Sequence, residues 1–125
     1  MKKFILLSLF AAVIMAGFTT CKKTTTITCN LAKTDTAPSD MTIVFKAEKT
    51  GDGTISTLSY QVGTVTKTVT NPTLPWTTSV QASSGDAISI TATGTTADGS
   101  ITVSYEGENQ TDKIQGEDYC SHTNN

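Results

Sequence analysis

Apolar and polar residues alternate in many parts of this chain, and a period of two residues is typical of β-strands with one buried face. Seven stretches show this pattern wholly or in part: residues 25–29, 41–48, 55–60, 65–69, 77–80, 88–93 and 101–106. In the clearest of them, Ile43, Phe45 and Ala47 fall on one face. The alternation is interrupted near Ser56 and Thr57, where we expect a β-bulge.

Residues with turn chemistry separate these stretches. Asp52-Gly53 and Asp98-Gly99 are dipeptides typical of type I′ hairpin turns, in which both central residues have positive φ. A Ser-Ser-Gly-Asp run divides two later strands, and a segment with two prolines before the only tryptophan predicts an extended crossing. The chain is therefore expected to consist of short strands joined by tight connections.

Composition favours the same fold class. About a fifth of the chain is threonine, and β-branched residues lose side-chain freedom in helices but pack well on sheets. No segment after Cys21 carries an apolar stripe of helical period. Seven to eight short strands at regular spacing predict an all-β, immunoglobulin-like β-sandwich, with an open barrel as the alternative. Trp76 is expected to plug one end of the core.

The first twenty residues have the order of a secretory signal peptide. Positive charge at Lys2 and Lys3 precedes a nearly unbroken apolar run at residues 4–15, and small and polar residues then lead to Cys21. The apolar run is shorter than the roughly 20 residues that a membrane-spanning helix needs. Residues 1–20 are therefore predicted to be a signal peptide that is absent from the mature protein.

Phe18-Thr19-Thr20-Cys21 resembles the lipobox of bacterial lipoproteins, where a diacylglyceryl group is attached to the cysteine sulfur and cleavage leaves that cysteine first. Thr19 fits this pattern, whereas Phe18 and Thr20 replace the usual leucine and small residue. The resemblance implies lipidation of Cys21 and attachment to a membrane through acyl chains, each buried CH₂ contributing about 0.8 kcal/mol. The alternative is ordinary signal cleavage, with Cys21 as an incidental thiol.

The residues after Cys21 bear on the location. Lys22 stands where the inner-membrane retention signal has aspartate, and no acidic cluster like that of surface-export tags follows. We therefore expect the protein in the cell envelope, lipid-anchored to the outer membrane and facing the periplasm.

The charge balance argues against a nucleic-acid partner. Without Lys2 and Lys3, seven lysines remain against eleven acidic residues, and the chain contains no arginine. Proteins that bind nucleic acid neutralise phosphates with clusters of lysine and arginine, and the sequence offers no such cluster.

Cys29 and Cys120 remain once Cys21 is assigned to lipidation. An even pair of cysteines in an exported protein predicts a disulfide. This disulfide would close a loop of about 90 residues and stabilise the fold by roughly 4–5 kcal/mol. The alternative is two unpaired thiols. No second histidine or cysteine lies at the spacing of a metal site, so neither a metal nor another cofactor is expected.

These features predict four segments of the chain. They are a lipoprotein signal peptide (1–20), a lipid-anchored tether (21–28), a β-sandwich domain (29–120) and a frayed tail (121–125). Within the domain, residues 35–40 are expected to form a polar loop, and the sequence from Gly116 onward is expected to be irregular.

A set of short motifs lies within residues 40–115. Its members are Thr50-Gly51-Asp52-Gly53-Thr54-Ile55, Leu58-Ser59-Tyr60, Val69, Leu74-Pro75-Trp76, Ile88 to Ala92 and Ile101 to Tyr105. The set resembles the MmpS family of small, membrane-tethered, periplasm-facing β-sandwich proteins that accompany large resistance-nodulation-division (RND) transporters. The resemblance implies a β-sandwich and a transporter partner. MmpS proteins use an N-terminal transmembrane helix, whereas this chain has a lipobox-like sequence, and Cys29 and Cys120 do not match that family's cysteines.

Groups that could perform catalysis are sparse. The single histidine, His122, lies three residues from the end of the chain, and a nucleophilic triad needs such a base beside its nucleophile. Glu106 and Glu108 would share one face of a strand, as a glycosidase pair requires, but solvated surface residues are the simpler interpretation. We therefore expect no enzyme and assign no catalytic residue.

One modification site is suggested by a short motif. Asp35-Thr36-Ala37 resembles the Asp-Thr/Ser-small-apolar acceptor motif for O-glycosylation of exported proteins in some Gram-negative bacteria, with Thr36 as the acceptor. A three-residue motif also arises by chance in a threonine-rich chain.

Two classes of function agree with the sequence. The first is a non-catalytic interaction or accessory protein that docks on another envelope protein, such as an RND transporter, through a sheet edge or a loop end. The second is a module that binds a glycan or another small envelope ligand. Tyr60, Tyr105 and Trp76 are expected to pack in the core, and Tyr119 is expected to be partly exposed.

Overall fold

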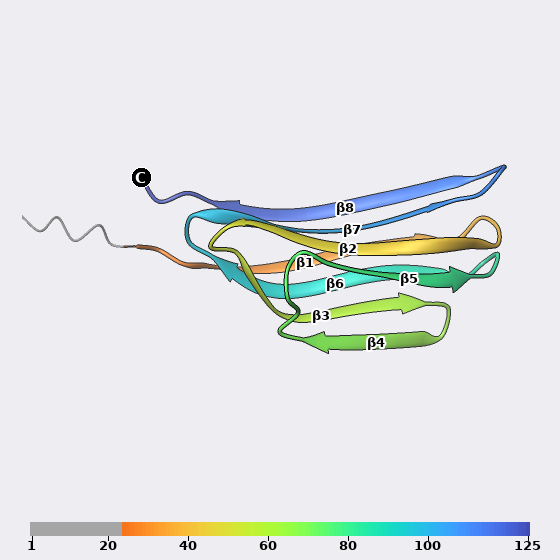
Figure 1. Cartoon of the computed structure of the whole chain (residues 1–125), viewed down its shortest axis with the longest axis horizontal. Helices are drawn as coiled ribbons and strands as arrows, with labels where there is room; N and C mark the ends of the chain where they lie inside the picture. Colours follow the sequence, from red (N-terminus) through yellow and green to blue (C-terminus); the bar gives the residue numbers. More distant parts are fainter. Residues whose placement is uncertain (1–23) are drawn as a thin grey trace, which may run out of the picture.

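A computed structural model describes residues 24–125 of the chain. These residues form eight strands and no helix: β1 (Ile27–Thr36), β2 (Met41–Gly51), β3 (Thr54–Val62), β4 (Val65–Thr70), β5 (Trp76–Ala82), β6 (Ala87–Thr96), β7 (Gly99–Glu108) and β8 (Lys113–His122). They make two antiparallel four-stranded sheets: sheet A, in the order β1-β6-β3-β4, and sheet B, in the order β5-β2-β7-β8 (Figure 1). The prediction of an all-β sandwich with seven to eight strands is confirmed.

The core lies between the two sheets and is built from the alternating residues that the sequence suggested. Ile43, Phe45 and Ala47 of β2 are fully buried, and so are Ile88 and Ile90 of β6. Residues between them point outward, because successive side chains of a strand face opposite sides of the sheet. The β-bulge expected near Ser56 is confirmed, since the register between β3 and β6 shifts there.

The two Asp-Gly dipeptides lie in tight connections, but neither is the expected hairpin, because the β2–β3 and β6–β7 connections each cross from one sheet to the other. Gly51 has a positive φ of 58°, whereas neither Asp52 nor Gly99 does, so the type I′ assignment is wrong. Gly51 and Gly99 lie directly opposite each other on β2 and β7. A Cβ on Gly51 would overlap the carbonyl oxygen of Asp98, and one on Gly99 would overlap that of Thr50. Glycine is needed here because the two backbones approach so closely.

Two segments expected to be irregular are strands instead. Asp35 and Thr36 complete β1, so the polar loop before β2 is shorter than expected. The sequence from Gly116 to His122 belongs to β8, an edge strand of sheet B. Ser121 and His122, which were assigned to a frayed tail, extend this strand to the level of Gly99. Alternation failed to reveal β8 because few of its inward positions carry apolar side chains.

Trp76 occupies a different place from the one expected. It pairs with Ala47 in the middle of β2 and packs against Tyr60 in a tilted arrangement, with ring centroids 5.5 Å apart. It is half-buried at the side of the sandwich, beside β4 and β5, rather than at one end.

The described chain begins and ends at the same end of the sandwich, which we call the entry end (Figure 1). The backbone amide of Thr25 donates to the side chain of Asn124 over 3.0 Å, and the Asn124 amide group donates back to the Thr25 carbonyl over 3.2 Å. The β2–β3, β4–β5 and β6–β7 connections lie at the entry end, and the other four lie at the far end.

Candidate functional site

The predicted disulfide is present. Cys29 on β1 and Cys120 on β8 are bonded, with Cα atoms 5.9 Å apart and a sequence separation of 91. The bond joins an edge strand of sheet A to an edge strand of sheet B. Cys21, the predicted lipidation site, lies outside the described residues.

Polar contacts reinforce the side of the sandwich where β1 meets β8. The backbone amide of Ala32 donates to the Asp118 carboxylate over 3.0 Å. The Tyr105 hydroxyl reaches from β7 to β1, where it donates to the Thr34 carbonyl (3.2 Å) and the Asp35 carboxylate (3.1 Å). Burial and the neighbouring Asp35 raise the pKa of Tyr105 to about 12. At neutral pH this phenol is therefore a hydrogen-bond donor that ties the sheets together, and it cannot act as a base.

At the entry end, the Asp52 carboxylate joins the β2–β3 and β6–β7 connections. A single oxygen, Oδ1, accepts hydrogen bonds from the Thr96 hydroxyl (3.0 Å) and from the backbone amides of Ala97 (2.9 Å) and Asp98 (2.9 Å). The amides of Ala97 and Asp98 are the main reason that the pKa of Asp52 is lowered. The carboxylate is thus committed to the β6–β7 turn, as expected for an aspartate with a structural role.

This arrangement predicts a defined response to acid. Because the pKa of Asp52 is lower in the folded protein than its unfolded value of 3.8, its charge stabilises the fold above that pH. The contribution is lost as the pH falls below 3.8 through the folded pKa. Asp52→Asn should therefore be less stable than the wild type near neutral pH, and the difference should shrink between about pH 5 and about pH 2.

Denaturant unfolding of both proteins across that pH range is the measurement. Glu48→Gln, a change at an exposed residue of β2 whose side chain makes no hydrogen bond or ion pair among the described residues, controls for general loss of negative charge. A stability gap between wild type and Asp52→Asn that stays constant down to the lowest pH would contradict the prediction.

Most of the other residues considered for catalysis or metal binding have structural or solvated positions. A ring nitrogen of His122, Nδ1, lies 2.8 Å from the carbonyl oxygen of Ala97. Glu106 forms an exposed ion pair with Lys46 at 3.7 Å, a kind of contact that contributes little. Within residues 24–125, no three His, Cys, Asp or Glu side chains group as a metal site would require. The same residues contain no helix with the length and hydrophobicity that crossing a membrane requires.

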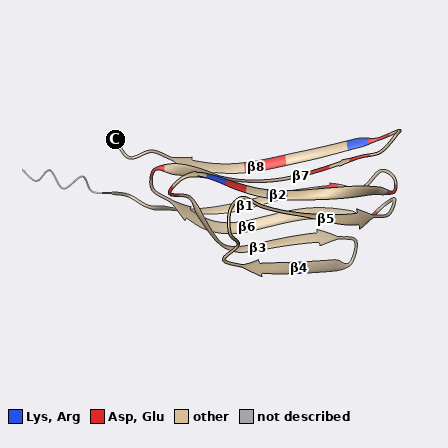
Figure 2. Cartoon of the chain, viewed as in Figure 1, with Lys and Arg blue, Asp and Glu red and all other residues tan. Residues whose placement is uncertain are grey.

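The outward face of sheet A carries hydroxyl and amide groups but no charge. Its residues are Thr28, Asn30, Ala32, Thr34, Thr54, Thr57, Ser59, Gln61, Thr66, Thr68, Thr70, Ser89, Thr91, Thr93 and Thr95. Neighbouring hydroxyls bond across the strands, for instance Ser59 with Thr68 at 3.0 Å and Thr54 with Thr95 at 3.1 Å. The charged residues of sheet B and of the loops stand out in Figure 2. We call this uncharged surface the hydroxyl face.

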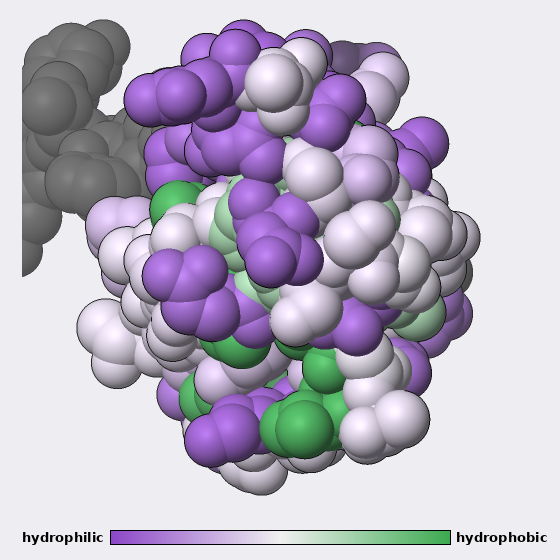
Figure 3. Space-filling model, turned by 90° about the vertical axis from the view of Figure 1, so that its right-hand side faces the viewer, coloured by the Kyte–Doolittle hydropathy of each residue, from purple (hydrophilic) through white to green (hydrophobic). Residues whose placement is uncertain are grey.

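The far end of the sandwich is closed by short polar loops (Figure 3). Asn109 donates to the Ser39 hydroxyl at 2.7 Å, and Ser39 donates to the Asp112 carboxylate at 2.7 Å. Between the polar groups, hydrophobic residues reach the surface at one side of this end (Figure 3). Val65, at the β3–β4 turn, is 57 % exposed.

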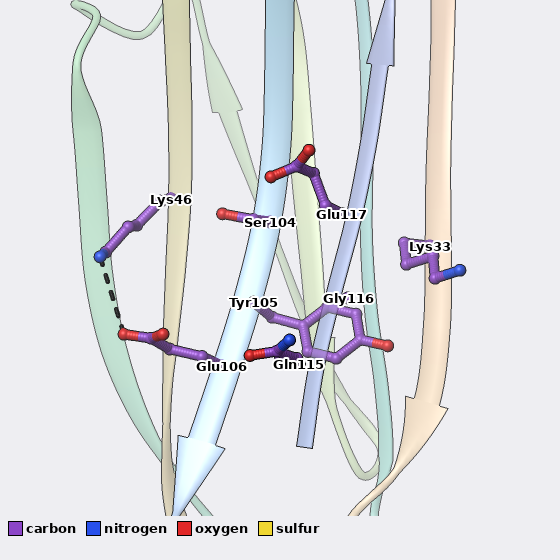
Figure 4. Close-up of a pocket in the computed structure, with 8 residues that line it drawn as sticks. All are labelled: Lys33, Lys46, Ser104, Tyr105, Glu106, Gln115, Gly116 and Glu117. Carbon is purple, nitrogen blue, oxygen red and sulfur yellow. Dashed lines mark ion pairs between the residues drawn. The ribbon is translucent and has the colours of Figure 1, made fainter. Parts of the chain in front are cut away.

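A shallow groove is lined by residues of β2, β7 and β8 in sheet B and by Lys33 of β1 in sheet A (Figure 4). Its volume is about 400 Å³, and its lining comprises Lys33, Lys46, Ser104, Tyr105, Glu106, Gln115, Gly116 and Glu117. The close-up shows the Lys46–Glu106 ion pair at one side of Ser104 and Glu117 at the other. The groove offers mixed charges, and Glu117 lies opposite Ser104 on the neighbouring strand. Among the described residues no hydrogen bond links either the Glu106 or the Glu117 carboxylate to the Ser104 hydroxyl, so this serine is not activated as a nucleophile in this arrangement.

Thr36, the predicted O-glycosylation site, is exposed at the end of β1. Asp35 accepts the backbone amide of Thr36 over 2.8 Å, and the following Ala37 is fully buried, which holds the motif in a fixed conformation at the surface. In protein purified from its native host, we expect a hexose-type mass addition on the peptide that contains Thr36.

The test of this modification is the intact mass of three proteins. The addition should persist in Thr34→Ala, a change at another exposed threonine of β1, and should be absent from Thr36→Ala. An unmodified wild-type mass would end the hypothesis.

Comparisons with protein-family models, curated proteins and solved structures found no match for this chain. Its own geometry defines its class: an antiparallel β-sandwich whose edge strands β1 and β8 are joined by a disulfide. The sequence had not revealed the joining roles of Asp52 and Tyr105. For Tyr105, the signal that sequence reasoning could have used is Gly116, a glycine within β8 that lies opposite the tyrosine.

Proposed function

We propose that this protein is a non-catalytic envelope lipoprotein, anchored by acyl chains on Cys21, that acts as an interaction or accessory protein. The observation that carries the proposal is the position of the first strand. β1 begins at Ile27, shortly after Cys21, and the chain from Thr25 is already bonded to Asn124. A lipid on Cys21 would therefore hold the folded domain close to the membrane, with its entry end toward the bilayer and its far end outward.

The location and the partner complete the proposal. Lys22 after the lipidated cysteine supports attachment to the outer membrane, facing the periplasm. The resemblance of residues 40–115 to MmpS proteins supports an RND-type transporter as the partner. The β-sandwich is compatible with this resemblance but carries no functional argument by itself, because one fold hosts many functions.

The anchor is tested by comparing the wild type with Cys21→Ser in the native host. We expect the wild type to incorporate a radioactive fatty acid and to be recovered in the membrane fraction. Cys21→Ser should show neither result. Cys29→Ser, which keeps Cys21, should remain labelled. A wild-type protein that is unlabelled and released into the soluble fraction would refute lipid anchoring.

The partner is tested by cross-linking the lipidated protein in its own membranes, followed by purification and mass spectrometry. Recovery of an RND-type transporter above the level obtained with Cys21→Ser is the expected result. Recovery of no protein above that control would refute the accessory role.

A second candidate function is favoured by the hydroxyl face. A broad surface of hydroxyl and amide groups without charge can form hydrogen bonds with a neutral glycan and does not repel it. The ordinary explanation for these residues is that threonine suits exposed strand positions. If the face binds glycan, retention on immobilised neutral polysaccharide should be lost in Thr91→Lys but kept in Thr102→Lys, a change on sheet B. Equal retention of the two variants would exclude this face as the glycan site.

A further inference from the structure

The two long sides of the sandwich are closed in different ways. On one side, the edge strands β1 and β8 are joined by the Cys29–Cys120 disulfide and by the hydrogen bond from Ala32 to Asp118. The other side is bounded by the edge strands β4 and β5. Within residues 24–125 no hydrogen bond joins β4 to β5. We call the space along this side the open seam.

Apolar side chains line the open seam without being fully covered. Tyr60, Val69, Trp76 and Val80 are half-buried against the core, and Val65 is exposed. Phe45, Tyr60 and Trp76 form a row of rings that runs from the core to this side, with centroid separations of 5.2 and 5.5 Å. The seam therefore offers a partly desolvated aromatic surface next to free strand edges, and burying it would be favourable.

Charge distinguishes β5 from the other three edge strands. Natural proteins protect exposed edges with charged side chains, which discourage pairing with another strand. Such residues are present on β1, β4 and β8: Lys33, Asp35, Lys67, Lys113, Glu117 and Asp118. Trp76–Ala82 contains no charged residue and no proline. β5 is thus the edge without this protection.

Lys67 gives the seam a single positive charge. This lysine is on β4, opposite Tyr60 of β3, and it shares the face of β4 that carries Val65 and Val69. Among the described residues it forms no ion pair. A strand that packed along the seam would therefore be complementary if it carried a carboxylate opposite this lysine.

We propose that β5 accepts an extended segment of a partner protein as a fifth strand of sheet B. The segment has apolar residues at alternate positions, which pack on Tyr60 and Trp76, and one acidic residue that faces Lys67. Main-chain hydrogen bonds to β5 supply affinity, and the alternate side chains supply specificity. This inference rests on the proposed function in one respect: the partner is an envelope protein near the same membrane.

A second copy of this chain is a poorer occupant. Two β5 strands related by a two-fold axis pair antiparallel, which reverses the second sandwich and places the two entry ends at opposite ends of the joined sheet. Two chains anchored through Cys21 in one membrane have their entry ends on the same side. A segment of another protein has no such constraint.

The experiment places a photo-cross-linking amino acid at Ser79 of the lipidated protein in its own membranes, with Thr91 of β6 as the matched control. Both positions are exposed strand residues, one on β5 and one on the hydroxyl face. We expect the Ser79 probe to capture one protein, at a residue that peptide mapping assigns to an extended, alternating segment with an acidic residue. The Thr91 probe should not capture it.

A second variant tests the edge itself. Thr78→Lys places a charge on the seam side of β5, and we expect it to reduce capture by the Ser79 probe about tenfold or more. Thr91→Lys should leave capture unchanged, and both variants should melt close to the wild type. The proposal is overturned if Ser79 captures nothing, captures another copy of this chain, captures a helical segment, or captures equally in Thr78→Lys. If the pull-down recovers a partner while Ser79 does not reach it, the accessory role stands and the β5 site falls.

Discussion

Replacing Cys29 and Cys120 together with alanine is expected to lower the free energy of unfolding by about 4 kcal/mol. The disulfide spans 91 residues, nearly the whole described chain, so it removes much of the freedom of the unfolded state. For a domain of this size such a loss corresponds to a fall of about 20 °C in the melting temperature. Small domains have total stabilities of about 5–15 kcal/mol, so the variant should be folded but marginal.

Alanine is the suitable replacement because Cys29 is buried in the core and a serine there would bury a hydroxyl. Thermal unfolding of the wild type with and without a reducing agent is the companion measurement, and the reduced wild type should match the double variant. The amide of Ala32 should also exchange faster in the variant, since its partner Asp118 is held near β1 partly by the neighbouring disulfide. Identical melting of oxidised wild type and double variant would show that the disulfide contributes nothing.

The strands that could be predicted from the sequence are those with one fully apolar face. β2, β6 and β7 alternate clearly because their inward residues, such as Phe45 and Ile90, form the core, and burial there does not depend on knowing the partner strands. The disulfide could be predicted because pairing the two cysteines that remain in a chain with a signal-like first segment needs no geometry.

β8 could not be predicted because its inward positions depend on residues that are distant in the sequence. Gly116 leaves room for Tyr105, and Asp118 receives the amide of Ala32 on β1. Neither residue has a large apolar side chain, so the sequence of β8 does not alternate between apolar and polar residues. Asp52 is a similar case: the sequence locates its own turn, but its hydrogen-bond donors lie at another turn 44 to 46 residues later.

The candidate interaction site was the least predictable part. Nothing in the sequence of β5 shows that it is an edge strand, because edges follow from the order β5-β2-β7-β8. Once that order is known, the absence of charge in Trp76–Ala82 indicates an edge strand without protection against pairing. Lys67 across the seam then indicates where an acidic residue of a partner could bind. The covalent and hydrogen-bonded side at β1 and β8 holds the two sheets together, which leaves the side at β4 and β5 available for a partner.

Gly116→Ala is expected to destabilise the protein by about 2–4 kcal/mol, although alanine usually suits a strand better than glycine. Gly116 lies opposite Tyr105, and a Cβ added there would overlap the Oη and Cζ atoms of the tyrosine and approach its Cε1 to 2.8 Å. The ring would have to move, and its hydrogen bonds to Thr34 and Asp35 would be lost. Gln115→Ala, at the exposed neighbouring position, should have little effect.

Two measurements separate this steric mechanism from a general effect on β8. In a Tyr105→Leu background the cost of Gly116→Ala should be much smaller, because the overlapping atoms are gone and the two changes are not additive. In the wild type, ultraviolet titration should show one tyrosine that ionises near pH 12. The stability that this group contributes should be fully present below its unfolded pKa of 10.0 and should disappear as the pH rises through about 12. Gly116→Ala should return this ionisation toward the ordinary value. An equal cost of Gly116→Ala in both backgrounds, with the late ionisation unchanged, would show that Tyr105 does not depend on the glycine.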